Sequence, residues 1–403
     1  MNVVVVVQKI KDPVNYSIEF LRALKSSLDI PITVTLISDH IIDFPDDIIV
    51  DLKLNYSNFE AFIPNTEEFI NTQLNIQKQI AVSKKLGRRK SSEEIILEHM
   101  KFLSFYDYCL SKIKPDLVVV WNGITHSFQT SMVEVAQEKK IPIIFLERGL
   151  IPGTVFYDFE GVNFESSIGK NINWQQSDHL LNDPSVYDYV KDIINKTGGG
   201  LVELEVNKNI NIPIDPYVFF PLQRDTDSNL LFNSPYIKNM FYILSILNQW
   251  KSTNLDLEFL VRSHPEDPEK HYTKLLDFDE LIFQSDGDLL ETIKRAHTVM
   301  TVNSTIGFTA LILDKNIISL GNSVYSGKKL CIEPKSIDEI QELLVLRKDD
   351  NISDDRLALT NNRKDFINKI IANNHISFRY NALKNIQFKS LKNQIVEKLN
   401  VGS

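Results

Sequence analysis

The stretch NVVVVV, residues 2–7, decides the fold class, because five consecutive valines leave no polar face on the strand that they form. A strand that is apolar at every position is buried on both faces, as in parallel sheets covered by helices. Comparable runs recur, and each is followed by polar loop residues and a helical period. The first series continues with ITVTLI at 32–37, DLVVVW at 116–121 and PIIFL at 142–146.

A second series of apolar runs begins near the middle of the chain. Two successive series of strands alternating with helices predict an α/β fold with two Rossmann-like, doubly wound domains. We expect these domains to face a central cleft, because open α/β sheets bind ligands beyond the carboxyl ends of their strands. The second series consists of PYVFFPL at 216–222, LEFLVR at 257–262, TVMTV at 298–302 and NIISLG at 316–321.

The two series also set the expected domain boundaries. We place an N-terminal Rossmann-like domain at residues 1–205, with a helical insertion at about 66–112. A C-terminal Rossmann-like domain follows at 206–350, and the helices of 351–403 are expected to pack back across both domains. The glycine-rich segment at 196–216 is the candidate linker between them.

Composition disfavours several classes of protein. A net charge of -9 over 403 residues argues against nucleic-acid binding, which needs a clustered basic face, and the basic run KKLGRRK at 84–90 is interpreted as a solvated turn. Cys109 and Cys331 are far apart, so we expect no disulfide framework, no metal cluster and a cytoplasmic location. No segment approaches the roughly 20 apolar residues of a membrane span.

Polar residues follow the strands of the first series. Asn122 after DLVVVW forms a turn at low steric cost, or it hydrogen-bonds a polyol ligand. The stretch FLERGLIPGTVFYDFEGVN at 145–163 holds the carboxylates Glu147, Asp158 and Glu160. A lone carboxylate at a strand end is usually solvated or caps a helix, whereas several together indicate acid/base chemistry or recognition of sugar hydroxyls.

The strands of the second series are followed by a different set of residues. Asp225 and Asp227 after PYVFFPL either cap a helix or supply a nucleophile or base. His264, in Ser-His-Pro, is either a surface residue or a donor to a phosphate oxygen.

The run TVMTV leads into Asn303, Ser304 and Thr305. Hydroxyl residues that open a helix present donors to an anion, with the helix dipole behind them. The chain has neither GxxxxGK[ST] nor GxGxxG, which argues against a P-loop NTPase and a dinucleotide dehydrogenase. An anion site in one half and a carboxylate-rich edge in the other predict a two-domain enzyme that uses nucleotide sugars.

Four stretches in order carry a resemblance to a known family. They resemble the bacterial capsule-polysaccharide biosynthesis family, and more narrowly the retaining β-Kdo glycosyltransferases of capsule and O-antigen assembly. The similarity spans roughly residues 116–330. The stretches are FLERGLIPGTVFYDFEGVN at 145–163, VFFPLQRDTDS at 218–228, RSHP at 262–265 and NSTIGFTALILDKNIISLGNSVY at 303–325.

The resemblance implies a GT-B-like architecture and transfer of Kdo from CMP-β-Kdo to a saccharide acceptor with retained configuration. Retention by double displacement needs a nucleophile that forms a covalent glycosyl-enzyme. The family also implies a lipid-linked acceptor, work at the inner face of the bacterial inner membrane with peripheral membrane association, and further transferase modules in the same polypeptide. No metal or other cofactor is expected, because protein donors suffice for the departing CMP.

Residue roles follow from the same resemblance. Asp227 fits the nucleophile position better than Asp225, Glu147 is the acid/base candidate, and His264 acts on the CMP phosphate. The implied nucleotide-binding residues are His264, Asn303, Ser304, Thr305, Gly321 and Tyr325. The implied sugar- and acceptor-binding residues are Asn122, Arg148, Asp158, Asn163 and Gln223, with Asp158, Gly161 and Asn163 matching a D-x-x-G-x-N pattern.

One position departs from related enzymes, and three alternatives stay open. Thr309 stands where many GT-B enzymes have a ribose-binding glutamate, so the identity of the nucleotide base rests on analogy and a UDP-sugar epimerase ranks last. An inverting CMP-sugar transferase of sialyltransferase type needs the same residue types. A non-catalytic saccharide-binding module is the alternative from another class. The acceptor sugar, the linkage position and the oligomeric state are not determined by the sequence.

Overall fold

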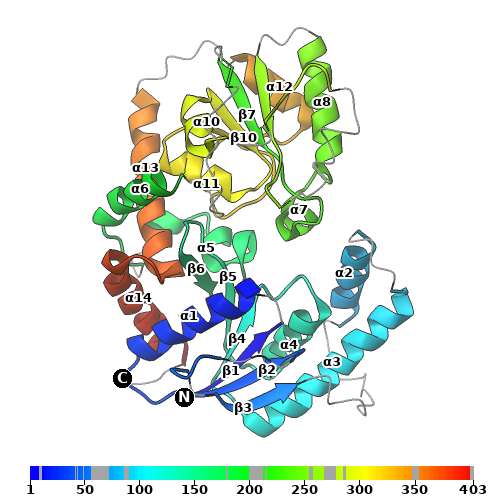
Figure 1. Ribbon diagram of the computed structural model, residues 1–403, viewed down its shortest axis with the longest axis vertical. Coiled ribbons are helices and arrows are strands. Elements are labelled where there is room, and N and C mark those ends of the chain that lie inside the picture. The colour runs from blue at the N-terminus through cyan, green and yellow to red at the C-terminus, as the bar shows by residue number, and fades with distance from the viewer. Residues whose placement is uncertain are drawn as a thin grey trace. The chain divides into compact units, whose positions relative to one another are not determined.

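The protein divides into two compact units in a computed structural model (Figure 1). Unit 1 comprises Met1–Gly149, Gly153–Ser167 and Ala372–Ser403, and unit 2 comprises Leu150–Pro152 and Ile168–Ile371. The structure describes residues 1–8, 11–40, 42, 44–48, 50–55, 72–85, 90–177, 180–198, 212–213, 216–253, 257–266, 278–284, 287–346 and 354–399.

Among the residues described, unit 1 contains a seven-stranded sheet in the order β12-β6-β5-β4-β1-β2-β3. The five strands β1 to β5 are parallel, and the strand order reverses between β1 and β4. The remaining pairs, β5 with β6 and β6 with β12, are antiparallel. The strands are β1 (Asn2–Val7), β2 (Thr33–Ser38), β3 (Val50–Asn55), β4 (Leu117–Trp121), β5 (Ile143–Arg148), β6 (Thr154–Asp158) and β12 (His375–Ser377).

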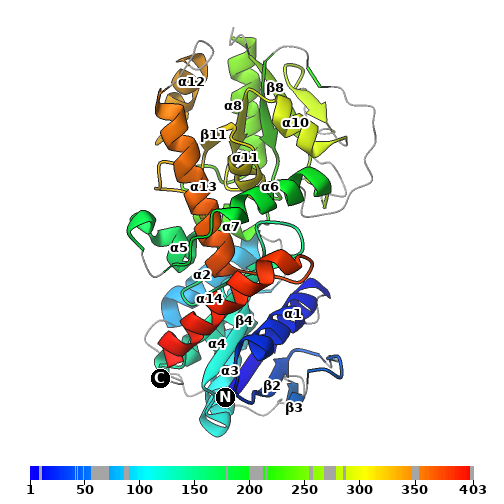
Figure 2. The same ribbon diagram turned by 90° about the vertical axis from the view of Figure 1, so that its left-hand side faces the viewer.

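The five valines of β1 explain why helices cover both faces of this sheet. Val3, Val5 and Val7 pack toward α1 and α14, whereas Val4 and Val6 pack toward α3 and α4. Burying such a side chain fully stabilises the fold by about 1.5–3 kcal/mol. Figure 2 shows α1 and α14 side by side. The helices are α1 (Lys11–Ser27), α2 (Thr72–Lys85), α3 (Ser92–Ile113), α4 (Ser127–Glu138) and α14 (Asn381–Leu399).

In the described part of unit 2, five strands form a parallel sheet in the order β11-β10-β7-β8-β9. The chain starts at β7 in the centre, moves out through β8 and β9, and returns to β10, so the order reverses between β7 and β10. Helices α8 and α12 pack on one face of the sheet. The strands are β7 (Tyr217–Pro221), β8 (Glu258–Arg262), β9 (Ile282–Gln284), β10 (Thr298–Thr301) and β11 (Asn316–Ser319).

The remaining described helices lie between residues 163 and 374. They are η2 (Asn163–Glu165), α5 (Ser167–Lys170), η3 (Trp174–Gln176), α6 (Ser185–Thr197), α7 (Ser228–Asn233), α8 (Met240–Ser252), α10 (Leu289–Arg295), α11 (Thr305–Ile312), α12 (Ile337–Leu346) and α13 (Asp354–Asn374). Within the described ranges, every helix is too short or too polar to cross a bilayer.

The structure confirms the predicted α/β class with two doubly wound sheets, and the chain returns at its end to the N-terminal sheet through β12 and α14. The compact units divide near residue 168 rather than at 205. The reason is α6, which belongs to unit 2 because Tyr187 Oη donates to Ile312 O at 2.9 Å and Tyr187 N donates to Asn368 Oδ1 at 2.7 Å. Of the proposed linker at 196–216, residues 199–211, 214 and 215 lie outside the described residues.

The apolar pattern did not reveal the hairpin of β5 and β6. The sequence placed Glu147 and Arg148 in a loop, but β5 extends through both and pairs with β6, with Glu147 opposite Phe156. Gly149 makes the connection tight, because a Cβ there would lie 1.9 Å from Thr154 Oγ1 and 2.7 Å from Thr154 O. The glycines of this stretch therefore build a hairpin turn.

Lys328 is a buried cation in unit 2. Its Nζ donates to Gly169 O at 2.7 Å and to Ser326 O at 3.0 Å. Burial lowers the pKa of Lys328 from its ordinary value of 10.5 to about 8, although Glu333 opposes the shift. Both acceptors are neutral carbonyls, so they satisfy the ammonium group without neutralising it.

We expect Lys328 to make stability depend on pH. Below pH 8 the lysine is charged in both states, so the folded state carries the full cost of burying the charge. As pH rises from 8 to 10.5 the folded state loses the proton first, and the free energy of unfolding increases. Denaturant unfolding should show a gain of about 1–2 kcal/mol between pH 7.5 and 9.5 that Lys328→Met loses.

The exposed neighbour Lys329 provides the matched control. Lys329→Met should keep the wild-type gain over the same pH range. An equal gain in wild type and Lys328→Met would show that the buried lysine does not set this pH dependence.

Candidate functional site

The loops that carry most of the predicted site residues lie at one edge of the sheet in unit 2. Because β7, β8, β10 and β11 are parallel, the loops that follow them meet at the carboxyl edge. The strand order reverses between β7 and β10, and sheets of this kind usually bind ligands beside such a reversal. The loops supply Gln223, Asp225 and Asp227 after β7, His264 after β8, Asn303, Ser304 and Thr305 after β10, and Gly321 and Tyr325 after β11.

Gln223 and Asn303 form a reciprocal pair across this reversal point. Gln223 Nε2 donates to Asn303 Oδ1 at 2.9 Å, and Asn303 N donates to Gln223 Oε1 at 3.1 Å. Both side chains are buried, and Asn303 Nδ2 also donates to Asn229 O at 2.9 Å. The sequence assigned Gln223 to the sugar and Asn303 to the nucleotide. The structure shows that together they join the loops after β7 and β10.

Asp227 caps a helix and also lies near basic side chains. Its Oδ1 accepts from Asn229 N at 2.8 Å at the start of α7. Burial raises the pKa of the Asp227 carboxyl, and the Asn229 N–H and then the charges of His264 and Arg224 oppose this rise. The helix-capping interpretation is therefore confirmed, and the role of nucleophile or base remains a prediction.

Asp225 has a different structural role. Its Oδ1 accepts from Met240 N at 2.8 Å, at the first residue of α8. The carboxylate thus fixes the start of another helix. Asp225 and Asp227 are two residues apart in sequence, yet they fix the starts of two different helices.

His264 has its ring orientation set by the backbone. Its Nδ1 accepts from Glu266 N at 3.1 Å, so a neutral ring carries its proton on Nε2. The imidazole can therefore donate through Nε2 without being positively charged. Arg262, two residues before His264, was not predicted as a site residue. It is buried, and its guanidinium donates to Gln284 Oε1 at 3.3 Å and Gly287 O at 2.9 Å.

The start of α11 is held by Ser304 and Tyr325. Ser304 Oγ accepts from Ile306 N at 3.2 Å, and Tyr325 Oη donates to Ser304 O at 3.3 Å. A Cβ on Gly307 would lie 2.0 Å from Tyr325 Oη, so glycine is required for this approach. Thr305 is the first residue of the helix. This arrangement fixes a helix N-terminus at the carboxyl edge, where its dipole favours an anion.

Gly321 keeps the loop after β11 close to the loop after β10. A Cβ there would lie 3.0 Å from Val302 Cγ1 and 3.1 Å from Asn233 O. Its carbonyl accepts from Ser319 Oγ at 2.9 Å. Gly321 therefore contributes to the site through packing.

In unit 1, the structure joins Asn122 to Glu147. Asn122 Nδ2 donates to Glu147 Oε2 at 2.7 Å, and Arg148 N donates to Glu147 Oε1 at 3.0 Å. Asn122 also forms the predicted turn, with φ of 59° and with Oδ1 accepting from Ile124 N and Thr125 Oγ1. Arg148 ends β5 and is paired in register with Val155. The two hydrogen bonds fix the orientation of the Glu147 carboxyl group.

Asp158 organises a loop from within unit 1. Its carboxylate accepts from the N–H groups of Glu160, Gly161 and Ser167, from Ser167 Oγ at 2.5 Å and from Asn374 Nδ2 at 3.1 Å. Burial raises the pKa of Asp158, and these donors oppose the rise.

The other two residues of the D-x-x-G-x-N pattern have backbone roles in the same loop. A Cβ on Gly161 would lie 2.8 Å from Glu165 O, and Asn163 has a left-handed φ of 55°. The pattern thus has a structural explanation, and the sugar contacts predicted for Asp158 and Asn163 remain a prediction.

A second pair lies at the point in unit 1 where the strand order reverses. Gln129 of α4 donates through Nε2 to Oε1 of Gln8, which follows β1, at 2.9 Å. The sequence offered no signal for this pair beyond the polar residues that end β1. Throughout the described ranges, no group of three or more His, Cys, Asp or Glu side chains is arranged to hold a metal ion.

Comparison with known proteins finds similarity to a protein sequence and to solved structures. Protein FixF of Sinorhizobium fredii (strain NBRC 101917 / NGR234) is 26% identical over 297 residues, which cover 70% of this chain and 68% of that protein. Among solved structures, the β-Kdo 2,7 transferase of Thermosulfurimonas dismutans KpsC has a TM-score of 0.43 at 15% identity, covering 78% of this chain and 96% of that one. The S. aureus MnaA–UDP structure has a TM-score of 0.41 at 12% identity, covering 100% and 97% of the two chains.

The family comparison concerns unit 2. The model described as capsule polysaccharide biosynthesis protein matches residues 187–357, which contain β7 to β11 and all the carboxyl-edge loops that follow β7, β8, β10 and β11. Through this region, the chain is similar to the capsule polysaccharide biosynthesis protein family.

Proposed function

We propose that this protein is a retaining β-Kdo glycosyltransferase that moves Kdo from CMP-β-Kdo to a saccharide acceptor of bacterial surface polysaccharide. The match of residues 187–357 to the capsule polysaccharide biosynthesis protein model supports a role in that synthesis. The motifs from 145 to 325 support the narrower donor and mechanism. On this proposal the acceptor is lipid-linked, and transfer takes place at the cytoplasmic face of the inner membrane.

The observation that carries the proposal is the grouping of Asp227, His264 and the capped start of α11 at one carboxyl edge. His264 is set to donate through Nε2, and Ser304 begins a helix whose dipole favours an anion. Asp227 lies close enough to His264 for their charges to interact. A carboxylate beside a phosphate site is what double displacement on a nucleotide sugar requires.

The proposed chemistry takes place in two steps. The Asp227 carboxylate attacks the anomeric carbon of Kdo, the bond from that carbon to the phosphate oxygen breaks, and its electron pair leaves with CMP. An acceptor hydroxyl then attacks the same carbon, displaces Asp227 and gives up its proton to a base. The two inversions together retain the configuration.

Glu147 keeps the acid/base role within this proposal. Donors to both of its oxygens fix the orientation of its carboxyl group, and a fixed carboxyl group suits the role of receiving the proton of an acceptor hydroxyl. Asn122 orients it, since the amide donates to Oε2 while its own oxygen is fixed by the following turn. Asn122 is thus a positioning residue.

Replacing Asp227 tests the nucleophile directly. Asp227→Asn should reduce transfer by roughly 10³-fold or more, because an amide cannot form the glycosyl ester. Asparagine also caps helices well, so the start of α7 should be preserved. Intact-protein mass spectrometry with CMP-Kdo generated in situ should find one Kdo unit on the wild-type peptide that contains Asp227 and none on the variant.

Asp225→Asn is the matched control, since Asp225 also fixes a helix start and lies two residues away. It should keep the adduct. Near wild-type turnover in Asp227→Asn would rule out the nucleophile assignment. Release of CMP only when an acceptor is present, with no adduct, would favour the inverting mechanism.

Substitutions of His264 can test the roles of its two ring nitrogens separately. His264→Gln places a donor near the position of Nε2, whereas His264→Asn keeps only a group near Nδ1. We expect His264→Ala and His264→Asn to weaken CMP binding by roughly 10-fold or more, as for loss of a hydrogen bond to a charged group, and His264→Gln to retain part of the affinity. Isothermal titration calorimetry with CMP provides the measurement.

His297 serves as the control, because it precedes β10 and therefore lies at the opposite edge of the same sheet. His297→Ala should bind CMP as wild type does. Unchanged CMP affinity in His264→Ala would remove the phosphate role from His264.

A further inference from the structure

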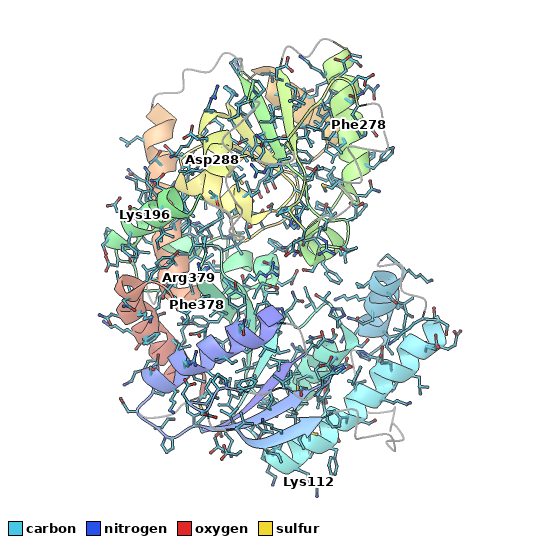
Figure 3. The ribbon with its side chains drawn as sticks, viewed as in Figure 1. Lys112, Lys196, Phe278, Asp288, Phe378 and Arg379 are labelled. Atoms are coloured by element: carbon cyan, nitrogen blue, oxygen red, sulfur yellow. The ribbon has the colours of Figure 1, made fainter. Side chains whose placement is uncertain are left out.

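A pocket of about 380 Å³ lies in unit 1, outside the polar pairs described above. Its walls come from α1, from the segment after β2 and from the short connection between β12 and α14. Figure 3 labels Phe378 and Arg379 on that connection. The side chains that matter for recognition are Asn15, Tyr16, Glu19, Arg22, Phe378 and Arg379.

Aromatic rings link this pocket to the carboxyl edge of the sheet. Tyr16 stacks on Trp121, the last residue of β4, with ring centroids 5.5 Å apart and planes at 27°. The ring of Phe378 meets Tyr16 edge-on at 5.6 Å and 64°. The residue after Trp121 is Asn122, which orients Glu147. Tyr16, Trp121 and Asn122 therefore connect the pocket to Glu147, the acid/base candidate of the same unit.

The polar walls of the pocket are held in place before any ligand binds. Arg22 donates to both oxygens of Asp47, at 2.6 and 2.9 Å, and to Glu19 Oε1 at 2.7 Å. These bonds fix a guanidinium and a carboxylate side by side. Side chains that are already ordered lose little entropy when a ligand binds.

Gly153 positions the opposite wall. It has a φ of 73°, and a Cβ there would lie 2.6 Å from Arg379 Cδ and 2.8 Å from Arg379 Cγ. Phe378 N donates to Gly153 O at 3.2 Å. The aliphatic stem of Arg379 thus lies directly on the backbone of the β5–β6 connection. A larger residue at position 153 would clash with the stem of Arg379.

We propose that this pocket is a saccharide subsite that holds a sugar ring of the acceptor. A sugar offers an apolar C–H face to the rings of Tyr16 and Phe378, and its hydroxyls both donate and accept. The walls match that mixture, since Arg22, Arg379 and Asn15 donate while Glu19 accepts. The inference rests on the proposed transferase function and adds the location and residues of acceptor binding.

Binding of oligosaccharides to the full chain tests the subsite without requiring turnover. The probe is an array of oligosaccharide fragments from bacterial O-antigens and capsules. Phe378→Ala should bind the best fragment about 10-fold more weakly than wild type, because it loses the ring face, whereas Phe378→Tyr keeps the ring and should bind normally. Arg379→Ala should also weaken binding. Thermal unfolding confirms that each variant is folded.

Matched controls come from unit 2. Phe241 is 45% exposed on α8, and Arg295 is exposed on α10, so Phe241→Ala and Arg295→Ala remove the same side-chain types away from the pocket. Both should bind the fragment as wild type does. In transfer assays, Phe378→Ala should raise the KM for that fragment about 10-fold, while CMP release from CMP-Kdo without acceptor stays unchanged.

The outcomes separate this inference from the proposed function. Wild-type affinity in Phe378→Ala and Arg379→Ala, or no oligosaccharide bound by wild type, would overturn the subsite even if CMP-Kdo is cleaved. Binding that depends on Phe378 in a protein that never releases CMP would support the subsite and refute the transferase. Weakened binding together with unchanged CMP release would support both.

Discussion

Burial of the central parallel strands on both faces is the constraint on which the rest of the structure depends. In β1, alternate valines pack into two separate cores, one with α1 and α14 and one with α3 and α4. Helices therefore cover both faces, and polar groups gather where strands end. The same holds in unit 2, where the loops after four parallel strands supply every predicted residue of that unit.

At this edge, two of the predicted site residues also cap helices. Asp227 and Ser304 each cap a helix, and capping fixes the backbone around them. A cap does not exclude a functional role, because a carboxylate or hydroxyl has more than one lone pair. Burial raises the pKa of Asp227, whereas the Asn229 N–H and then the charges of His264 and Arg224 lower it, so its ionisation depends partly on a basic residue of its own loop and on one of the loop after β8. This coupling links the proposed nucleophile to the phosphate-binding side.

Apolar runs predicted eight of the parallel strands, because burial on both faces leaves a continuous signal in the sequence, but they missed the parallel edge strands β3 and β9. They did not predict β6 or β12, whose pairing depends on a glycine turn and on residues more than two hundred positions apart. The candidate site residues could be predicted because they directly follow strands that the apolar runs revealed. The pairing of Gln223 with Asn303 was not found, since strand order decides which loops become neighbours.

The glycines of FLERGLIPGTVFYDFEGVN show how one stretch can combine several constraints. Because Gly149 has no Cβ, Thr154 can pack closely against it in the hairpin. Gly161 leaves room in the same way for the Glu165 carbonyl, beside the loop held by Asp158. Gly153 leaves room for the stem of Arg379. Only the last of these contacts brings the end of the chain to the pocket beside α1. Because β12 pairs with β6 and α14 packs on α1, the returning segment is held on both sides of Phe378 and Arg379. The C-terminal return thus completes one wall of the pocket as well as the core of unit 1, and this explains why the pocket could not be inferred from the N-terminal half of the sequence alone.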